Sequence, residues 1–284
     1  MGCACCATSW LPDPALSDML KKRLVFTLLY DGGSFMLSRN FRLQKVGDLR
    51  WLQRHYDFSR IAFHIDELIV LDVTRGVRDP VRFCDTLKAL TEGCFVPIAA
   101  GGGVRSLEHA RQLLRSGADK VVINTALHEQ PDLAVELAED FGQQCVVGAV
   151  DLRRDADGQP RAWVDRGMRA LPGSALDAMA WLRKPHIGEL YLNSMDRDGT
   201  GQGYDMGLLD LVAPHCSVPI ILAGGVGNAL HLLAGLADAR VDAAATAHLF
   251  NFIGDGLARA RQQIVAAGQT MASWPPASSL GAAA

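Results

Sequence analysis

The sequence predicts a (β/α)8 barrel made of two similar halves. Eight short apolar runs, rich in Val, Ile, Leu and Ala, alternate along the chain with segments of helical pattern. The runs are continuous rather than interrupted by polar residues, which is typical of parallel strands covered on both faces. A repeat also relates the first four runs to the last four. These observations favour a closed barrel over the alternative, an open doubly wound sheet.

A single barrel accounts for most of the 284 residues. Barrels of this kind contain about 250 residues, and we expect this one to span residues 19–268. Residues 1–18 are predicted to be a disordered extension or to precede the true start, because Met19 stands shortly before the first strand. Residues 269–284 are predicted to be a flexible tail.

The expected strands and helices follow one another in regular order. Ser106 caps one helix, and Pro131 and Gly142 mark the two ends of another. After the fifth strand, residues 154–169 are expected to form a hairpin that turns at Asp157 and Gly158. The expected strands are 24–29, 67–73, 96–101, 120–124, 145–151, 188–194, 218–222 and 241–246. The expected helices are 79–91, 106–115, 131–141, 174–182, 206–213, 228–236 and 255–267.

The composition excludes several classes of partner. A net charge of −3 gives no reason to expect nucleic acid or an acidic membrane surface, and no apolar run approaches the length of a transmembrane helix. The seven cysteines are an odd number, and four lie singly in apolar segments, which predicts reduced thiols in a cytoplasmic protein. Cys3 and Cys6 have the spacing of a zinc pair, but no second pair accompanies them. We therefore predict no metal site and no cofactor.

The internal repeat indicates approximate two-fold symmetry. The segment PIAAGGGV at 97–104 recurs as PIILAGGV at 219–226, 122 residues later. Glu67 and Glu189 are separated by the same interval, and similar segments of this kind are typical of a barrel built from two half-barrels. An elongated substrate with a phosphate group at each end would suit this symmetry.

Glycines after the third strand predict the first phosphate site. Gly102 and Gly103 allow backbone N–H groups to approach an anion closely, and the following helix N-terminus favours negative charge. A plain turn that requires positive φ is the alternative interpretation. Asn124 and Thr125 end the fourth strand and offer further donors.

The equivalent glycines after the seventh strand, Gly224 and Gly225, predict a second phosphate site. This site is poorer in donors, because Ala223 and Ala247 lack hydroxyl groups. His248 would contribute when it is protonated.

Asp151, at the end of the fifth strand, is the best candidate for acid–base catalysis. A carboxylate that is partly shielded from water has its pKa raised towards the working range. Asn193 ends the sixth strand, and Asp198 in the following loop is expected to bind substrate hydroxyl groups. A solvated turn is the alternative for Asp198. The repeat would place a second carboxylate at position 29, but this residue is a leucine.

A second group of charged residues is expected at the opposite end of the barrel. These four residues stand at the starts of strands one, two, four and six. Burying each one alone would be costly, whereas two positive and two negative charges can pair in a ring. They are Arg23, Glu67, Lys120 and Glu189. The ring would form a polar gate on the barrel axis; solvated charges at strand ends are the alternative.

Together, these residues resemble the cyclase subunit of imidazole glycerol phosphate synthase, from about Met19 to Gly268. The most specific segments are DELIVLD at 66–72, GGG at 101–103, GADKVVINT at 117–125 and SMDRDGT at 194–200. The resemblance implies a (β/α)8 barrel that is docked on a glutaminase subunit. Ammonia released from glutamine enters through the ring of four charges and meets a bis-phosphorylated ribonucleotide at the other end. Asp119 matches a family position at the glutaminase interface.

The chain departs from the family pattern at three places. The family uses two catalytic aspartates; Asp151 matches one, and Leu29 replaces the other. The family's lysine in the loop after strand one aligns with Leu37. The usual serines of the second phosphate site align with Ala223 and His248. Because leucine cannot take or give a proton, these departures put the histidine-pathway reaction in doubt.

Three functions are compatible with this pattern. The first is a synthase subunit that conducts ammonia for the amidation of a sugar, as in divergent members linked to surface-polysaccharide synthesis, with a separate sugar-amidating enzyme as a second partner. The second is the histidine-pathway cyclase itself, with another group substituting for the missing carboxylate. The third is a non-catalytic activator of the glutaminase, or a related phosphosugar isomerase.

Overall fold

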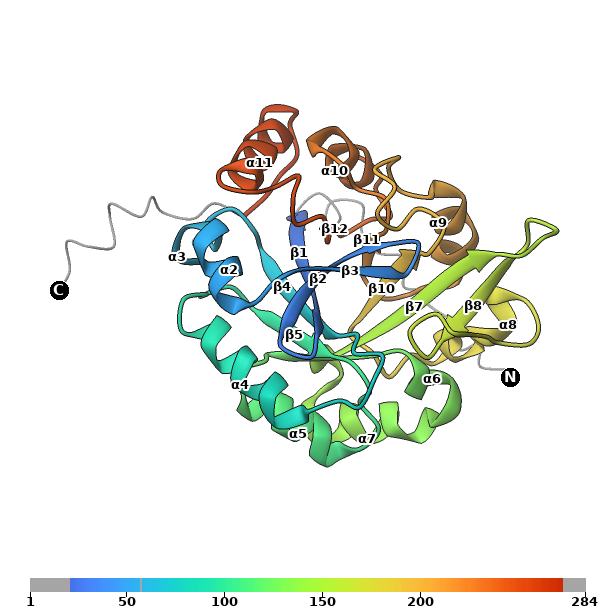
Figure 1. Ribbon diagram of the computed structural model, residues 1–284. Coiled ribbons are helices and arrows are strands. Elements are labelled where there is room, and N and C mark those ends of the chain that lie inside the picture. Colours follow the sequence, from blue (N-terminus) through green and yellow to red (C-terminus); the bar gives the residue numbers. More distant parts are fainter. Residues whose placement is uncertain (1–20, 57, 273–284) are drawn as a thin grey trace, which may run out of the picture.

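The computed structural model describes residues 21–56 and 58–272 (Figure 1). The predictions for residues 1–18 and for the tail beyond residue 272 lie outside the described residues. The first residues of the predicted tail are not loose. The Lys22 N–H donates to the Thr270 carbonyl at 2.8 Å, and Met271 is buried, so the chain is held here against the start of the first strand.

Eight parallel strands close into a barrel, as predicted. Each strand pairs with its neighbours in the order β10, β11, β12, β1, β4, β5, β6, β7, and the pairing of β7 with β10 completes the ring. Figure 1 shows the helices around the outside of this barrel. The barrel strands are β1 (Arg23–Asp31), β4 (Glu67–Asp72), β5 (Ile98–Gly101), β6 (Lys120–Ile123), β7 (Val146–Arg154), β10 (Glu189–Ser194), β11 (Ile220–Ala223) and β12 (Ala243–Thr246).

Local capping explains where several helices begin. The side chains of Asp79, Ser106 and Asn228 each accept a hydrogen bond from a backbone N–H three residues later. The predicted helix 174–182 is instead a short α-helix followed by a 3-10 helix (Ala180–Arg183). The α-helices are α2 (Leu49–His55), α3 (Phe58–Ile61), α4 (Pro80–Thr91), α5 (Leu107–Arg115), α6 (Thr125–Glu129), α7 (Pro131–Phe141), α8 (Ala175–Ala178), α9 (Met206–Val212), α10 (Ala229–Leu236) and α11 (Gly256–Ala266).

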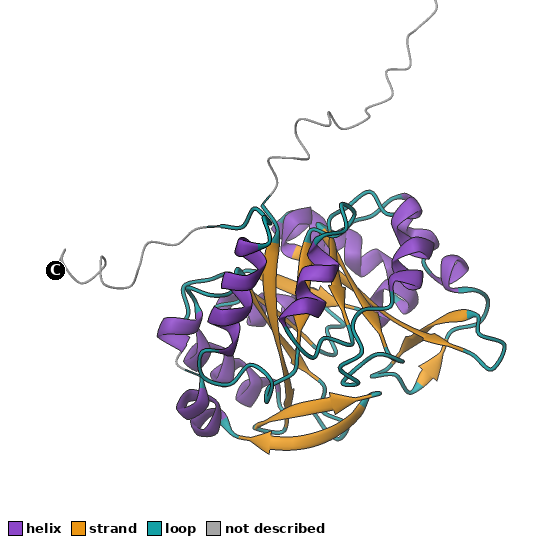
Figure 2. Ribbon diagram, turned by 90° about the horizontal axis from the view of Figure 1, so that it is seen from above, coloured by secondary structure: helices purple, strands orange, loops and turns teal. Residues whose placement is uncertain are grey.

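Two hairpins extend the barrel strands β1 and β7 beyond the barrel. The hairpin predicted after the fifth strand is confirmed: β7 continues antiparallel to β8 (Pro160–Val164), which pairs with β9 (Arg169–Ala170). The other hairpin, β2 (Ser34–Arg39) with β3 (Arg42–Gly47), was not predicted. It lies across one end of the barrel, where Figure 1 labels it, and Figure 2 gives the view turned by 90°.

The strand register confirms the two-fold repeat. Leu29 of β1 lies opposite Leu71 of β4, and Asp151 of β7 lies opposite Asn193 of β10. Each pair is separated from the other by the 122 residues of the repeat, so position 29 is the structural equivalent of Asp151. Asp31 lies two residues further along β1. It pairs with Ser34 of the hairpin and lies beyond the pairing with β4, which ends at Tyr30.

The core has two layers. One lies between the strands and the helices, and the other fills the barrel itself. The inner layer is made of small and branched apolar side chains plus one aromatic residue, which is how such barrels fill their interior. Its buried members are Val25, Ile69, Ala99, Val122, Val147, Ala149, Tyr191, Ile221, Ala223, Ala243 and Ala245.

A buried ion pair joins the last helix to the barrel. Arg261 of α11 donates from Nη1 and Nη2 to the two carboxylate oxygens of Asp66 at 2.8 and 2.9 Å. Asp66 also accepts the Leu24 N–H at 2.8 Å. Both charged side chains are nearly inaccessible, with exposed fractions of 9% and 4%. The pair therefore fixes α11 against the start of β1.

The Arg261→Met variant should lose about 3 kcal/mol of unfolding free energy, because it leaves the Asp66 carboxylate buried without its cation. Urea denaturation at neutral pH measures this loss. Arg259→Met is the matched control, since Arg259 forms an exposed pair with Asp255 on the same helix and should cost no more than about 1 kcal/mol. Equal losses in the two variants would contradict the assigned role of Arg261.

Candidate functional site

A solvent-accessible pocket lies at the carboxyl ends of the barrel strands. Its walls include all of the residues predicted to bind substrate, although they come from distant parts of the sequence. The pocket lining contains Asp151, Gly102, Gly103, Asn124, Thr125, Asn193, Asp198, Gly224, Gly225 and His248. The closure of the barrel thus brings every predicted catalytic and substrate-binding residue to one cavity.

Asp151 is held at the centre of this pocket by two amide groups. Asn124 Nδ2 donates to Asp151 Oδ2 at 2.7 Å, and Asn193 Nδ2 donates to Oδ1 at 2.8 Å. Burial raises the pKa of Asp151 to about 6, although the hydrogen bond from Asn193 opposes this shift. A carboxyl group with this pKa exchanges its proton near neutral pH, as a general acid or base must. Asn124 is therefore a partner of Asp151, in addition to lining the predicted phosphate site.

The position opposite Asp151 in the two-fold arrangement offers no proton. Leu29 lines the pocket, as does Leu37 of the hairpin. One layer below, the Thr27 hydroxyl and the Tyr191 hydroxyl are 3.3 Å apart across the barrel interior. Burial raises the pKa of Tyr191, so its hydroxyl stays protonated. The Asp151 and Asp198 carboxylates are close enough to raise the pKa of Tyr191 further.

The first glycine turn is built for close approach. Gly102 and Gly103 have φ values of +119° and +71°, a region that favours glycine. A Cβ at Gly102 would collide with the Asp72 carbonyl, and one at Gly103 would lie 2.5 Å from Arg78 Nη1. Thr125, across the turn, accepts the Asp165 N–H at 3.1 Å. Only glycine leaves room here for the neighbouring chain and the Arg78 guanidinium.

The second glycine turn has the same backbone form but weaker donors. Gly224 and Gly225 have φ values of +87° and +105°. His248 lies beside them in the pocket lining, and burial lowers its pKa, so the imidazole is neutral at neutral pH. The contribution expected from protonated His248 therefore requires acidic conditions or a bound anion.

The Asp198 carboxylate accepts hydrogen bonds from the β2–β3 hairpin. Asp198 Oδ2 accepts the Ser38 hydroxyl at 2.5 Å and the Phe41 N–H at 2.9 Å. The adjacent Gly199 permits this contact, because a Cβ there would collide with the Ser38 carbonyl. Asp198 was predicted to bind substrate hydroxyl groups, yet one of its oxygens already accepts two donors, one from β2 and one from the turn between β2 and β3. The loop after β10 thus anchors the hairpin over the pocket.

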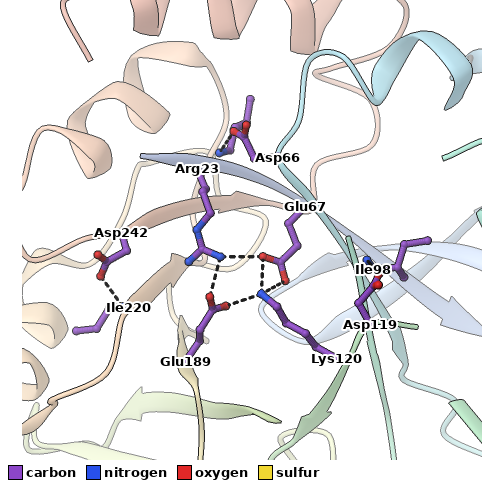
Figure 3. Close-up of polar contacts among 10 residues, drawn as sticks. Arg23, Asp66, Glu67, Ile98, Asp119, Lys120, Glu189, Ile220 and Asp242 are labelled. Carbon is purple, nitrogen blue, oxygen red and sulfur yellow. Dashed lines mark hydrogen bonds and ion pairs between the residues drawn. The ribbon is translucent and has the colours of Figure 1, made fainter. Parts of the chain in front are cut away.

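At the opposite end of the barrel, the four predicted charges form a closed ring (Figure 3). Arg23 Nη1 donates to Glu67 Oε2 at 2.9 Å and to Glu189 Oε1 at 2.8 Å. Lys120 Nζ donates to both Glu67 oxygens at 3.1 Å and to Glu189 Oε2 at 3.1 Å. Burial raises the pKa of Glu67, whereas the Lys120 and Arg23 cations lower it. Each charge therefore has two opposite neighbours.

Asp119 lies beside this ring on the exposed edge. Its carboxylate accepts the Ile98 N–H at 2.8 Å, and Asp242 accepts the Ile220 N–H at 2.8 Å in the same way (Figure 3). This bond recurs in both halves of the barrel, so Asp119 has a structural role at the start of β6. The side chain is also exposed, which leaves it accessible for the predicted partner contact.

Sequence reasoning missed a group of arginines on the first-half side of the pocket. They come from the turn between β8 and β9 and from the loops after β4 and β5. No spacing rule joins such distant positions, although two of the arginines are separated only by Gly76 and Val77 in the loop after β4. The four residues are Arg75, Arg78, Arg105 and Arg166.

In residues 21–56 and 58–272, no group of three or more His, Cys, Asp or Glu side chains is arranged to hold a metal ion. Among the helices that the structure describes, none has the length and apolar character that crossing a membrane requires.

Comparisons of the sequence with known proteins place the chain in one family. The profile of the histidine biosynthesis protein family matches residues 55–254. A protein of Parasynechococcus marenigrum, provisionally named imidazole glycerol phosphate synthase subunit hisF2, is 45% identical over 262 residues, which cover 92% of this chain and 97% of that protein. The imidazole glycerol phosphate synthase subunit HisF of Microcystis aeruginosa is 37% identical over 238 residues, covering 82% of this chain and 92% of its own length.

The raised pKa of Asp151 should appear in the pH dependence of stability. The folded chain binds this proton more tightly than the unfolded chain, so the stabilisation is present below the ordinary value of 3.8 and is lost as the pH rises through about 6. Between about pH 4 and about pH 8, wild type should lose about 2 kcal/mol relative to Asp151→Asn. Urea denaturation across this range tests it, with Asp157→Asn on the exposed hairpin turn as control. Parallel curves for wild type and Asp151→Asn would refute the shift.

Removing the Asp198 carboxylate should release the hairpin. Asp198→Ala loses two hydrogen bonds to a charged group, so local opening should become at least about tenfold more frequent. Trypsin cleavage at the exposed Arg39 and Arg42 reports this opening. Asp196→Ala is the control, because the Asp196 carboxylate accepts the Arg154 N–H of β7 and no donor from the β2–β3 hairpin. Unchanged cleavage in Asp198→Ala would show that other contacts hold the hairpin.

Proposed function

Because the chain belongs to the histidine biosynthesis protein family, together with HisF subunits of imidazole glycerol phosphate synthase, we propose that it is the ammonia-receiving synthase subunit of a glutamine amidotransferase. A glutaminase subunit would bind at the end of the barrel that carries the ring of charges and Asp119. The acceptor, a phosphorylated compound or a sugar, would receive ammonia at the pocket that contains Asp151.

The observation that carries this proposal is the arrangement of the two ends of the barrel around an apolar interior. The ring of Arg23, Glu67, Lys120 and Glu189 lies at the foot of the barrel, and the inner layer above it is almost entirely apolar. An apolar interior that opens transiently would admit neutral ammonia far more readily than ammonium, because burying an unpaired charge is costly. The Thr27 and Tyr191 hydroxyl groups offer hydrogen bonds midway. Passage along this axis would deliver ammonia as a nucleophile.

Leu29 favours an acceptor other than the histidine-pathway ribonucleotide. A mechanism with two carboxylates needs a second acid or base besides Asp151, and Leu29, which pairs with Leu71 as Asp151 pairs with Asn193, supplies neither. We therefore infer that ammonia is used for a different amidation, of the kind that modifies sugars of surface polysaccharides, with a separate sugar-amidating enzyme as a further partner.

The histidine-pathway cyclase is the second candidate. Two features favour it: the relatives named above are subunits of imidazole glycerol phosphate synthase, and Asp151 has the pKa of a working general acid or base. In this case the chain would convert the bis-phosphorylated ribulosyl-formimino ribonucleotide and ammonia to imidazole glycerol phosphate and aminoimidazole carboxamide ribonucleotide, with Asp151 acting without a second carboxylate.

Turnover of the purified chain on the histidine-pathway ribonucleotide, with ammonium salt as the nitrogen source, separates the two candidates. Wild type should be inert, and Leu29→Asp should be at least about a hundredfold faster, because a positioned acid–base group contributes about that much or more. Leu29→Asn is the matched control, since it adds polarity without a proton to exchange. Asp151→Asn in the Leu29→Asp background should abolish the gain.

Wild-type turnover at an ordinary enzymatic rate, on the order of 1 per second or faster, would establish the histidine-pathway cyclase and overturn the amidation proposal. Inert wild type with a rescued Leu29→Asp would identify the missing carboxylate as the cause. Failure of the chain to form a complex with a glutaminase from the same genome would overturn both candidates.

A further inference from the structure

Four arginine side chains gather on one side of the pocket. Arg75 and Arg78 follow β4, Arg105 follows β5, and Arg166 lies in the turn between β8 and β9; all four line the same cavity as Gly102 and Gly103. We refer to them as the arginine cluster. The second half of the barrel has no matching cluster: the residues 122 positions after Arg78 and Arg105 are Thr200 and Gly227. The residue equivalent to Arg75 is Arg197, whose guanidinium donates to Gln202 at 3.0 Å and is not among the pocket-lining residues.

The arginine cluster carries positive charge that neighbouring carboxylates do not fully balance. Arg78 pairs with Asp72 at 3.5 Å, and Arg105 pairs with Glu129 at 3.3 Å and with Asp165 at 3.5 Å. Glu129 and Asp165 are in turn shared with Arg169, outside the pocket lining.

The other two members of the cluster have carbonyl partners. Arg166 Nη1 donates to the Thr74 carbonyl at 2.7 Å, and Arg75 Nη2 donates to the Phe41 carbonyl. Among the described residues, no carboxylate lies within ion-pair distance of either guanidinium. Two positive charges therefore face the pocket without a counter-charge, and a guanidinium fork is suited to phosphate oxygens.

The backbone holds Arg166 in place at a conformational cost. Asp165, Arg166 and Gly167 have φ values of +52°, +62° and +70°. The first two are not glycines, and such residues in the left-handed region are strained. The Asp165 N–H donates to Thr125 Oγ1, which ties this turn to the end of β6. Strain of this kind persists where the surroundings impose it, and here it sets a cation against Thr74 in the loop after β4, on the same side of the pocket as Arg78, which lies next to Gly103.

The opposite end of the pocket has no comparable charge. The Arg197 side chain packs beside Gly225, but its guanidinium is held by Gln202 and Arg197 is not among the residues that line the pocket. The titratable lining residues on this side are His248 and Asp198, which interact with each other. Burial lowers the pKa of His248, so this end is close to neutral. A ligand with equal phosphate groups at its two ends would leave the arginine cluster partly uncompensated.

We propose that the pocket binds a ligand with a diphosphate group at the first-half end, one phosphate at the amides of Gly102 and Gly103 and the adjacent one between Arg75 and Arg166. The remainder of the ligand, near Gly224, would be uncharged. This inference deepens the proposed function, on which it rests for the assumption that the pocket holds the ammonia acceptor. It gives that acceptor a chemical class, a diphosphate ester.

Calorimetric titration of the purified chain with inorganic pyrophosphate and with inorganic phosphate tests the proposal. Wild type should bind pyrophosphate at least about tenfold more tightly than phosphate. The Arg75→Gln, Arg166→Gln double variant should lose this preference and retain the affinity for phosphate, which also shows that it is folded. Arg197→Gln, at the repeat-equivalent position, should behave as wild type.

Equal affinities of wild type for the two anions would overturn the proposal. A preference that survives in the double variant, or that is lost equally in Arg197→Gln, would also overturn it, because the charge would then act from elsewhere. These titrations contain no glutaminase, ammonia or acceptor. Pyrophosphate binding can therefore fail while ammonia transfer stands, and can succeed while ammonia transfer fails.

Discussion

The register at which β7 pairs with β10 determines which side chains meet on the barrel axis. Closure at this register places Glu189 level with Val147 and Asn193 level with Asp151. Since side chains alternate between the two faces of a strand, a shift of β10 by one residue would turn Glu189 and Asn193, the residue that holds Asp151, away from the axis. The ring of charges at one end and the catalytic candidate at the other therefore depend on the same set of backbone hydrogen bonds.

The two ends of the barrel handle buried charge in different ways. At the foot, two cations and two carboxylates neutralise one another, so the ring is tolerated in a nearly buried position. At the mouth, Asp151 has no cation beside it and is held by two neutral amides. Its charge is thus destabilised, and its proton is available at a useful pH. The charges at the foot neutralise one another, whereas the carboxyl group at the mouth can exchange its proton.

The strands and most helices could be predicted from sequence because each buries a continuous or periodic apolar face. The hairpin of β2 and β3 could not, since its anchoring residue, Asp198, is about 160 positions away. The pocket residues at strand ends were predicted because barrel topology brings those ends together. The roles of Asn124 and Asp198 depend on side-chain orientation, which spacing does not determine. The arginine cluster could not be predicted from sequence, because its members come from three separate loops.

The hydrogen bonds from backbone amides to Asp119 and Asp242 bear on how the two halves of such a barrel diverge. The same bond stands at the foot of both halves, whereas the mouths differ, with Asp151 in one and Leu29 in the other. Architecture and chemistry thus occupy opposite ends of each strand. A duplicated half-barrel can exchange one reactive group for another, or lose it, while the contacts that start its strands persist. The reactive side chains at the mouth can therefore change without altering the contacts that hold the fold together.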